Sequence, residues 1–289
     1  MSSKRRFLQY WAPVGGRCLR VSYPVATAVG WLAWQTQPRL RRMLVRNALP
    51  FCGGDLRRAK AAAKAAYKNV ARYWVDLAST PHRDFTRFEQ EHLTLVGSEH
   101  LAPLAAPGPV MIVSAHLGNP ELCLQALTAR GRAFHALVED IEPADFAAEI
   151  LRLRSAGGGH FHEATLGGVK ACLRALKDGA VVGLLADRDL QGTGICVELA
   201  GRTAKVARGP WEIARRSRAT VIPAFARRLR DDHFSVSVEE PFIVPDSGDL
   251  ECDVRWAAQR FAHLMEAHIR ADPGQWTPFE DFWRVHRCG

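Results

Sequence analysis

The sequence predicts an α/β fold: a central, mostly parallel or mixed sheet flanked by helices, with a helical annex before it. Two patterns support this prediction. From about residue 90 onward, short apolar or alternating stretches of strand length are interleaved with longer amphipathic stretches of helix length, an order typical of α/β sheets. Before that point the patterns are helical. We therefore divide the chain into an N-terminal helical segment, residues 1–85, and an α/β domain, residues 86–289.

The N-terminal segment is strongly basic. Residues 1–54 contain nine lysines and arginines and no acidic residue, whereas the whole chain has 39 basic and 30 acidic residues and a net charge of +9. The basic excess is therefore confined to this segment. It encloses an apolar, aromatic stretch at 21–34. This stretch is shorter than the ~20 apolar residues that span a bilayer, and Pro24 interrupts it.

We expect this stretch to form a helix that lies in the interface of an anionic membrane, with aromatic and basic side chains at headgroup level. Nucleic acid is not expected as a partner, because no motif interleaves basic and aromatic residues. An ordinary amphipathic helix packed on the domain is the alternative. The side chains expected at the membrane are Arg17, Arg20, Trp31, Trp34, Arg39, Arg41 and Arg42.

The helices are predicted from caps and apolar spacing. Asp55 and Asn119 are favoured N-caps, and Pro143 suits a first helical turn. Asp178-Gly179 is a stop signal, and the pair Thr80-Pro81 ends the first long helix. The predicted helices are 55–79, 98–104, 119–129, 143–155, 166–177, 210–218 and 253–269.

The strands are predicted from two kinds of pattern. Residues 110–114 and 180–186 are continuous apolar runs, which are typical of strands buried on both faces. Residues 233–239 alternate between apolar and polar side chains, which is typical of a half-buried strand. The predicted strands are 93–97, 110–114, 134–138, 180–186, 196–199, 220–226 and 233–239.

The cysteines predict a reduced, cytosolic protein. There are seven, an odd number, and none form a C-x-x-C pair. We therefore expect neither a disulfide framework nor a structural zinc site.

One stretch combines a base, an acid and a strand-to-helix junction. His116 follows the apolar run 110–114, and Glu121 comes five residues later. On one helix, five residues would separate the two side chains by ~140°. They can meet if His116 is still in the turn and only Glu121 is helical, which the cap Asn119 and the following Pro120 favour. The histidine then lies at the carboxyl end of a buried strand, where open α/β sheets bind ligands.

This pairing suits general-base catalysis. A neutral imidazole with a pKa near ~6.5 can take a proton from an alcohol. A carboxylate on the other ring nitrogen would fix the tautomer and stabilise the imidazolium. No G-x-S-x-G elbow supplies a nucleophile, so the attacking hydroxyl would belong to the substrate. Taken alone, the pattern is more typical of an ordinary helix start at which the glutamate lies on the surface. The motifs in the rest of the chain change this interpretation.

His116-Leu-Gly-Asn-Pro-Glu121 resembles the H-x(4)-D/E signature of the glycerolipid acyltransferase superfamily. With the strand before it, it is similar to the bacterial family of the lipid A late (lauroyl/myristoyl) acyltransferases and the phosphatidylinositol mannoside acyltransferases of actinobacteria. Further blocks resemble that family in the same order over roughly residues 20–285. They are 185–202 with its Asp-x-Asp, Gly209-Pro210-Trp211 with the later Val221-Ile222-Pro223, and Pro273-Gly-Gln275-Trp276.

Two departures from the family pattern occur at the signature. Pro120 stands where many members have a bulky aromatic residue, and Glu121 replaces the commoner aspartate. Neither change removes a catalytic group. Pro120 lacks a backbone N–H, so the helix start is a slightly poorer site for an oxyanion.

The resemblance implies an acyltransferase with His116 and Glu121 as the catalytic dyad. Arg154, with Arg152 as the alternative, is the arginine that the family has near this position. Asp187, Arg188 and Asp189 follow a buried strand, so they should emerge at the same sheet edge as His116. Arg202, Lys205 and Arg208 form a basic run before a helix start, suited to phosphates. No metal is expected, because a site at the aspartates would need His160 or His162 as a further ligand.

The predicted reaction moves a fatty acyl chain from acyl-CoA or acyl carrier protein to a hydroxyl of a membrane glycolipid or lysolipid. The acceptor would be of the lipid A precursor or phosphatidylinositol mannoside type. No cofactor is expected beyond the thioester donor. The predicted location is the cytoplasmic face of the bacterial inner membrane, peripheral or monotopic. Two alternatives are a lipid or thioester hydrolase using the same dyad, and a non-catalytic membrane lipid-binding protein.

Overall fold

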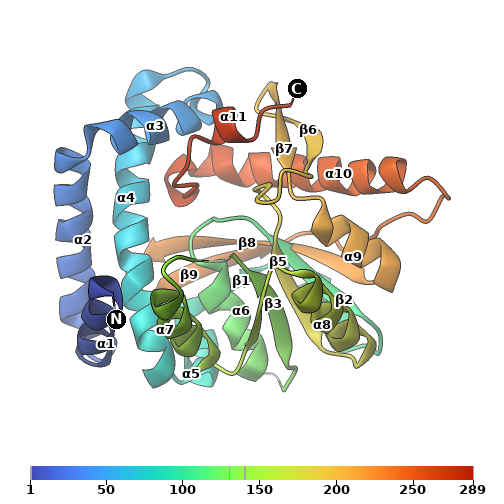
Figure 1. Ribbon diagram of the computed structural model, residues 1–289, viewed down its shortest axis with the longest axis horizontal. Coiled ribbons are helices and arrows are strands. Elements are labelled where there is room, and N and C mark those ends of the chain that lie inside the picture. Colours follow the sequence, from blue (N-terminus) through green and yellow to red (C-terminus); the bar gives the residue numbers. More distant parts are fainter. Residues whose placement is uncertain (1, 130, 140, 289) are drawn as a thin grey trace.

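A computed structural model describes residues 2–129, 131–139 and 141–288. Its centre is a mixed, mostly parallel sheet with the strand order β1-β9-β8-β2-β5-β3-β4, and β10 pairs with β8 (Figure 1). Among the described residues of this sheet, the pairs of β8 with β9 and with β10 are antiparallel and the other pairs are parallel. The strands of this sheet are β1 (Leu93–Val96), β2 (Val110–Ser114), β3 (Phe134–Val138), β4 (His160–Glu163), β5 (Val181–Leu185), β8 (Thr220–Arg230), β9 (His233–Val238) and β10 (Phe242–Ile243). The predicted α/β class is confirmed.

Helices cover both faces of the sheet. In β2, Met111 and Val113 pack with α8, α9 and α10, whereas Val110 and Ile112 pack with α5 and α6. Alternate side chains of a strand point to opposite faces, so an uninterrupted apolar run is needed where both faces are covered. The helices named here are α5 (Phe85–His92), α6 (Pro120–Ala129), α8 (Leu166–Lys177), α9 (Gly209–Ser217) and α10 (Leu250–Ala271).

The N-terminal helices form a layer at one end of the sheet (Figure 1). They are α1 (Ser3–Gly15), α2 (Leu19–Thr36), α3 (Pro38–Ala48) and α4 (Leu56–Ser79). The predicted Asp55 cap is present, since its carboxylate accepts from the Arg57 N–H at 2.8 Å. Gly30 lets α2 approach α4 closely, because a Cβ there would lie 2.9 Å from the α4 backbone. Within the described residues, no helix combines the length and the apolar character needed to cross a membrane.

Several elements differ from the prediction. The strand β4 was not predicted because its sequence, His-Phe-His-Glu, is polar, and it forms by pairing with β3. The strand β7 (Arg202–Val206) lies in the predicted basic run and forms a hairpin with β6 (Ile195–Leu199). Residues 98–104 form a 3₁₀ helix. The helices α1 and α11 (Phe282–Val285) were not predicted as separate elements. The helix α7 (Ala144–Ser155) matches its prediction.

The expectation of a chain without disulfides is wrong for one pair. Cys196 on β6 is bonded to Cys288, 92 residues later, whereas the other cysteines of the described part are free thiols. The pairing cannot be found from spacing, because only the fold brings the C-terminal segment to the β6–β7 hairpin. The Lys205 N–H donates to the His286 carbonyl at 2.7 Å in the same place.

A buried ion pair joins the N-terminal layer to the sheet. Asp76 of α4 and Arg228 of β8 form it, and both side chains are almost fully inaccessible. The Asp76 carboxylate also accepts from the Tyr23 hydroxyl at 2.7 Å and from the Asn119 amide at 2.8 Å. Asn119 in turn caps α6, because its side-chain oxygen accepts from the Leu122 N–H at 3.1 Å. The annex predicted for residues 1–85 is therefore packed onto the sheet through charged contacts.

Replacing Asp76 with asparagine should lower the free energy of unfolding by about 3–5 kcal/mol, because Arg228 would keep a buried charge without its partner. Urea denaturation followed by circular dichroism measures this. Glu240→Gln is the control, because the Arg260–Glu240 pair is exposed and should contribute less than about 1 kcal/mol. Equal losses in the two variants would contradict the prediction.

Candidate active site

Two neighbouring parallel strands bring His116 and Asp187 together. Ser114 at the end of β2 is paired in register with Leu185 at the end of β5. His116 and Asp187 each lie two residues beyond the end of their strand, so they emerge side by side at one sheet edge. The His116 Nδ1 atom lies 2.8 Å from the Asp187 carboxylate. This is the carboxyl edge, where α/β sheets bind ligands.

The Asp187 carboxylate is fully buried and bound by three donors. It accepts from the His116 backbone N–H at 3.1 Å and from the Trp276 indole at 3.0 Å, besides the imidazole contact. Burial by itself would raise the pKa of Asp187, but the charge of His116 and these hydrogen bonds lower it to about 2. Asp187 is therefore ionised at neutral pH. It holds the Nδ1–H tautomer of His116, so Nε2 is the nitrogen available to a substrate.

The His116 loop is fixed by the C-terminal segment 273–277. The His116 carbonyl accepts from the Thr277 N–H at 3.0 Å, and the Gly118 N–H donates to the Gln275 carbonyl at 3.1 Å. Gly118 has a positive φ of 60°, and a Cβ there would lie 2.7 Å from the Ala226 carbonyl oxygen. Only glycine fits this turn, because it lacks the Cβ.

Glu121 does not take the position predicted for it. Its carboxylate forms an ion pair with Arg154 at 2.9 Å and accepts a longer hydrogen bond from the Tyr73 hydroxyl at 3.4 Å. Arg154 also donates to the Tyr73 oxygen at 2.9 Å. Burial and the charge of Glu121 raise the pKa of Tyr73 to about 12, so this phenol stays protonated. The carboxylate on the His116 ring is that of Asp187, because Glu121 is turned toward α7 and α4.

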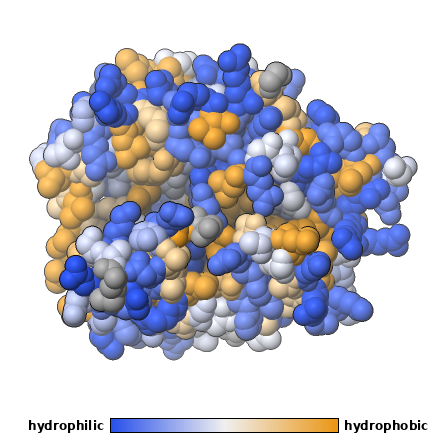
Figure 2. Space-filling view, viewed as in Figure 1, coloured by the Kyte–Doolittle hydropathy of each residue, from blue (hydrophilic) through white to orange (hydrophobic). Residues whose placement is uncertain are grey.

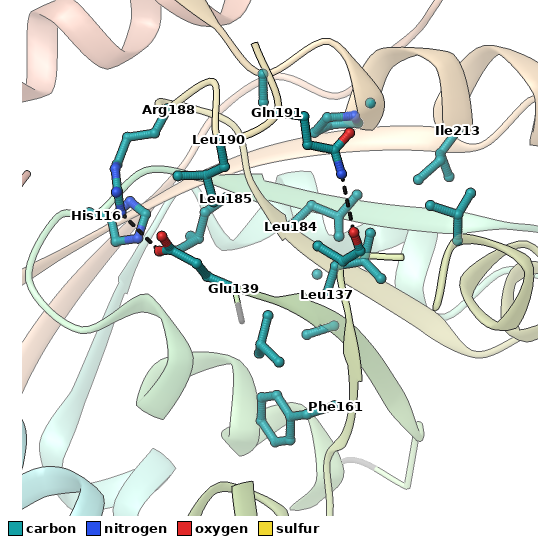
Figure 3. A pocket seen from close by; sticks show the side chains of 18 of the residues that line it. His116, Leu137, Glu139, Phe161, Leu184, Leu185, Arg188, Leu190, Gln191 and Ile213 are labelled. Carbon is teal, nitrogen blue, oxygen red and sulfur yellow. Dashed lines mark hydrogen bonds and ion pairs between the residues drawn. The ribbon is translucent and has the colours of Figure 1, made fainter. Parts of the chain in front are cut away.

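His116, Glu121 and Arg154 line one cavity of about 270 Å³. Its deeper wall is apolar, formed by strands β3, β4 and β5 and by α9, and Figure 3 shows Leu137, Phe161, Leu184 and Ile213 around the hollow. His116 lies at one end, beside Arg188 (Figure 3). The cavity therefore combines a long apolar surface with a charged end that contains the imidazole.

The predicted substrate-binding residues divide into two groups. Arg154, Arg188, Asp189 and Arg208 line the cavity. Arg188 forms an ion pair with Glu280 at 2.5 Å and a longer one with Glu139 at 3.4 Å. Arg208 binds Glu212 and Glu251, the latter at 2.6 Å.

Arg202 and Lys205 do not line the cavity. The exposed Arg202 guanidinium lies over the Trp283 ring at 5.2 Å, and Lys205 is on the β6–β7 hairpin. His160 and His162 lie on β4 beside His135, whose Nδ1 is 2.9 Å from the His162 Nε2. They are therefore not joined to Asp187 or Asp189 in a common cluster.

The residues predicted to contact a membrane lie on α2, α3 and the turn before α2. Arg17, Arg20, Arg39 and Arg42 are exposed, as is Trp31, whereas Arg41 and Trp34 are half-buried. The Arg41 guanidinium lies 5.5 Å from the centre of the Trp34 ring, which also packs edge-on against Tyr67. The basic side chains are thus available to an external partner, and Trp34 is partly used for packing.

Three residues of the site were not found from the sequence in these roles: Asp187 as the ring partner, Trp276 as its donor and Tyr73 as the partner of Arg154. For Asp187 a signal was present. Both His116 and Asp187 come two residues after a buried strand, and pairing the two strands in parallel would have aligned them. For Tyr73 and Trp276 the sequence contains no local signal, because their partners are 48 to 89 residues away.

Comparisons with known proteins identify the family to which this chain is similar. The model of the family described as bacterial lipid A biosynthesis acyltransferase matches residues 9–285, nearly the whole chain. Phosphatidylinositol mannoside acyltransferase of Mycobacterium tuberculosis is 27% identical over 229 residues, covering 76% of this chain and 69% of its own. The protein of the same name from Mycolicibacterium smegmatis is 25% identical over 224 residues, covering 76% and 71%.

The lowered pKa of Asp187 predicts a pH dependence. The folded value of about 2 lies below the ordinary ~3.9 of an unfolded chain, so ionised Asp187 stabilises the fold above pH ~4 and this contribution is lost as the pH falls toward 2. The stability difference between wild type and Asp187→Asn should therefore shrink by about 2 kcal/mol between pH ~5 and ~2. Urea denaturation at a series of pH values checks this, and a constant difference would contradict it.

Proposed function

The chain belongs to the bacterial lipid A biosynthesis acyltransferase family and is an acyltransferase, and we propose that His116 and Asp187 form its catalytic dyad. The observation that supports the proposal most directly is the 2.8 Å contact between the two side chains at the end of an apolar cavity. Such an arrangement combines a base with room for an acyl chain.

In the proposed reaction, His116 Nε2 takes the proton from the acceptor hydroxyl as its oxygen attacks the thioester carbonyl. Asp187 holds the Nδ1–H and stabilises the imidazolium that forms. The imidazolium then returns the proton to the departing thiolate. The acyl group passes directly to the acceptor, without an acyl-enzyme.

The acyl chain is proposed to occupy the apolar part of the cavity, next to Leu137, Phe161 and Ile213. The donor would be acyl-CoA or acyl carrier protein. Arg208, at the rim formed by the start of α9, is the cavity arginine best placed to meet donor phosphates, since its two partners are partly exposed glutamates. Guanidinium groups suit phosphates because they offer paired N–H donors.

The acceptor is proposed to be a membrane glycolipid, of the phosphatidylinositol mannoside or lipid A precursor type. Glu121 and Arg154 stand beside the base as a paired acid and cation. Burial by itself would lower the pKa of Arg154, but Tyr73 and Glu121 together raise it above its ordinary value, so the guanidinium remains charged. Together the two can bind hydroxyl and phosphate oxygens of a glycolipid headgroup. We assign Glu121 this positioning role.

Thiol release from palmitoyl-CoA with phosphatidylinositol mannoside as acceptor tests the dyad. His116→Ala and Asp187→Asn should each lower kcat by about 10²–10⁴-fold, because one removes the base and the other leaves it without its orienting carboxylate. Glu121→Gln should raise KM for the acceptor more than it lowers kcat, because it loosens Arg154. The exposed Glu240→Gln is the control.

Three outcomes of this assay would contradict the proposal. His116→Ala retaining more than about a tenth of the wild-type rate would exclude the base. Equal losses of kcat in Glu121→Gln and Asp187→Asn would contradict the assignment of Asp187, rather than Glu121, as the carboxylate that orients His116. Free fatty acid formed without dependence on acceptor would indicate a hydrolase.

We further propose that α1 and α2 bind the surface of an anionic membrane, on its cytoplasmic face. Val21, Val25, Val29 and Leu32 are each more than half exposed and follow the i, i+3 and i+4 spacings that place them on one face of α2. Phe7, Tyr10 and Val14 of α1 are exposed in the same way. Figure 2 shows hydrophobic surface along the edge of the molecule that contains α2. An apolar face beside exposed arginines is typical of an interfacial helix.

The double variant Val25→Asp/Val29→Asp should weaken binding to liposomes containing anionic phospholipid by at least about tenfold, because each valine buried in lipid contributes roughly 1.5 kcal/mol. Flotation of the full chain with liposomes measures this. Leu166→Asp is the matched control, since Leu166 is an exposed apolar residue of α8. Unchanged binding of the double variant, or an equal loss in the control, would refute the proposal.

A further inference from the structure

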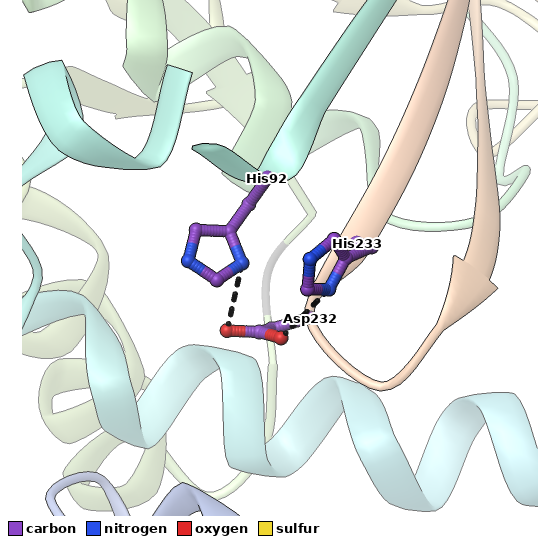
Figure 4. A group of neighbouring side chains, drawn as sticks. All are labelled: His92, Asp232 and His233. Carbon is purple, nitrogen blue, oxygen red and sulfur yellow. Dashed lines mark ion pairs between the residues drawn. The ribbon is translucent and has the colours of Figure 1, made fainter. Parts of the chain in front are cut away.

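Two histidines and an aspartate meet at the edge of the sheet formed by β1 and β9. Leu93 of β1 and Phe234 of β9 are paired in register, so the residues before them, His92 and His233, are aligned in the same way. Asp232 is the turn residue between β8 and β9. Figure 4 shows both imidazoles facing the Asp232 carboxylate from different segments of the chain. None of the three residues lines the cavity that contains His116.

The spacing of their ligand atoms fits a tetrahedral metal ion. The His92 Nδ1 lies 3.2 Å from one Asp232 oxygen, and the His233 Nδ1 lies 3.2 Å from the other. One ligand atom from each residue falls within 4.8 Å of the others. Zinc bonds of ~2.0–2.1 Å to nitrogen and oxygen place tetrahedral ligand atoms about 3.3–3.4 Å apart. The two His–Asp distances are therefore close to this spacing, and the ligand atoms, all within 4.8 Å of one another, would move closer together around a bound ion.

The nitrogens that face Asp232 are the Nδ1 atoms of His92 and His233. Both are buried, and neither has a hydrogen-bond partner among the residues that the structure describes, even though each lies close to the carboxylate. The contacts with Asp232 thus have the distance but not the alignment of hydrogen bonds. A buried polar atom without a partner is costly, and an ion bound between the three residues would satisfy both nitrogens. The side chains are 17–30% exposed, so an ion can enter and water can supply the fourth ligand.

Neighbouring charged side chains affect the affinity of these three residues for a divalent cation. The Arg83 guanidinium lies 3.8 Å from the Asp232 carboxylate and opposes a divalent cation. When a metal binds Nδ1, each ring keeps its hydrogen on Nε2. Glu91, 4.0 Å from the His92 Nε2, would move closer to accept that hydrogen. The exposed Arg230, 3.4 Å from the His233 Nε2, would turn toward water.

We propose that His92, Asp232 and His233 bind one Zn²⁺ ion with a water molecule as the fourth ligand. Nitrogen and carboxylate ligands in a tetrahedral set favour zinc among the common divalent ions. The ion joins the end of α5 and the start of β1 to the β8–β9 turn. The ion stabilises the fold, because it holds the turn that follows β8, and β8 carries Arg228.

The experiment uses the full chain without a histidine affinity tag, stripped of metal and titrated with ZnCl₂ against a chromophoric zinc chelator. Wild type should bind one equivalent with a dissociation constant in the micromolar range, and zinc should raise its melting temperature. Asp232→Asn and His233→Gln should each weaken binding by at least about 100-fold, since each removes a direct ligand. His160→Ala, in the separate histidine cluster of β3 and β4, should bind as wild type does.

The proposal is overturned if wild type binds no zinc, if the Asp232 and His233 variants bind as wild type does, or if His160→Ala abolishes binding. Circular dichroism checks that the variants are folded. If they are not, zinc X-ray absorption of the wild-type complex decides independently. Two imidazole nitrogens and two oxygens around zinc support the site, and sulfur ligands or a single imidazole refute it. Acyltransferase activity is not a readout in any of these measurements.

Discussion

The carboxylate of Asp187 is buried at the end of β5, where it receives hydrogen bonds from three donors. Two of them belong to His116, at the end of β2, and the third is the Trp276 indole near the C-terminus. A buried charge is costly unless such donors compensate for it, so the three segments are held in one arrangement. The same arrangement places the imidazole at the cavity, so the position of this imidazole is a consequence of burying the Asp187 charge.

A second buried carboxylate, that of Asp76, fixes the other end of the same loop. It binds the Asn119 amide, and Asn119 caps the helix that carries Glu121. His116 is thus held from the side of the sheet and Glu121 from the side of α4. Pro120 lies between these two anchors, at the first position of α6. Its missing N–H is not required by the helix there, so proline is compatible with the site.

The helix α4 connects the surface that we propose to bind a membrane with the interior of the site. Its residue Asp76 binds Tyr23 of α2, and its residue Tyr73 contacts both Arg154 and Glu121. The helices that would lie at the bilayer are therefore connected through α4 to Glu121 and Arg154, which line the cavity. This arrangement suits an enzyme whose proposed acceptor is a lipid, because one helix, α4, contacts both the proposed membrane-binding helices and groups of the cavity.

Local signals in the sequence determined most of the fold and part of the site. Caps such as Asp55 and Asn119, and apolar runs such as 110–114, act over a few residues and can be recognised directly. They predicted the α/β class, most elements and the histidine at the sheet edge. The tertiary structure alone decided which carboxylate reaches His116, how Trp276 supports it, that Cys196 meets Cys288 and that His92 lies beside His233. The physical reason is that these contacts join residues far apart in the chain, and only the strand order and register bring them within hydrogen-bond distance.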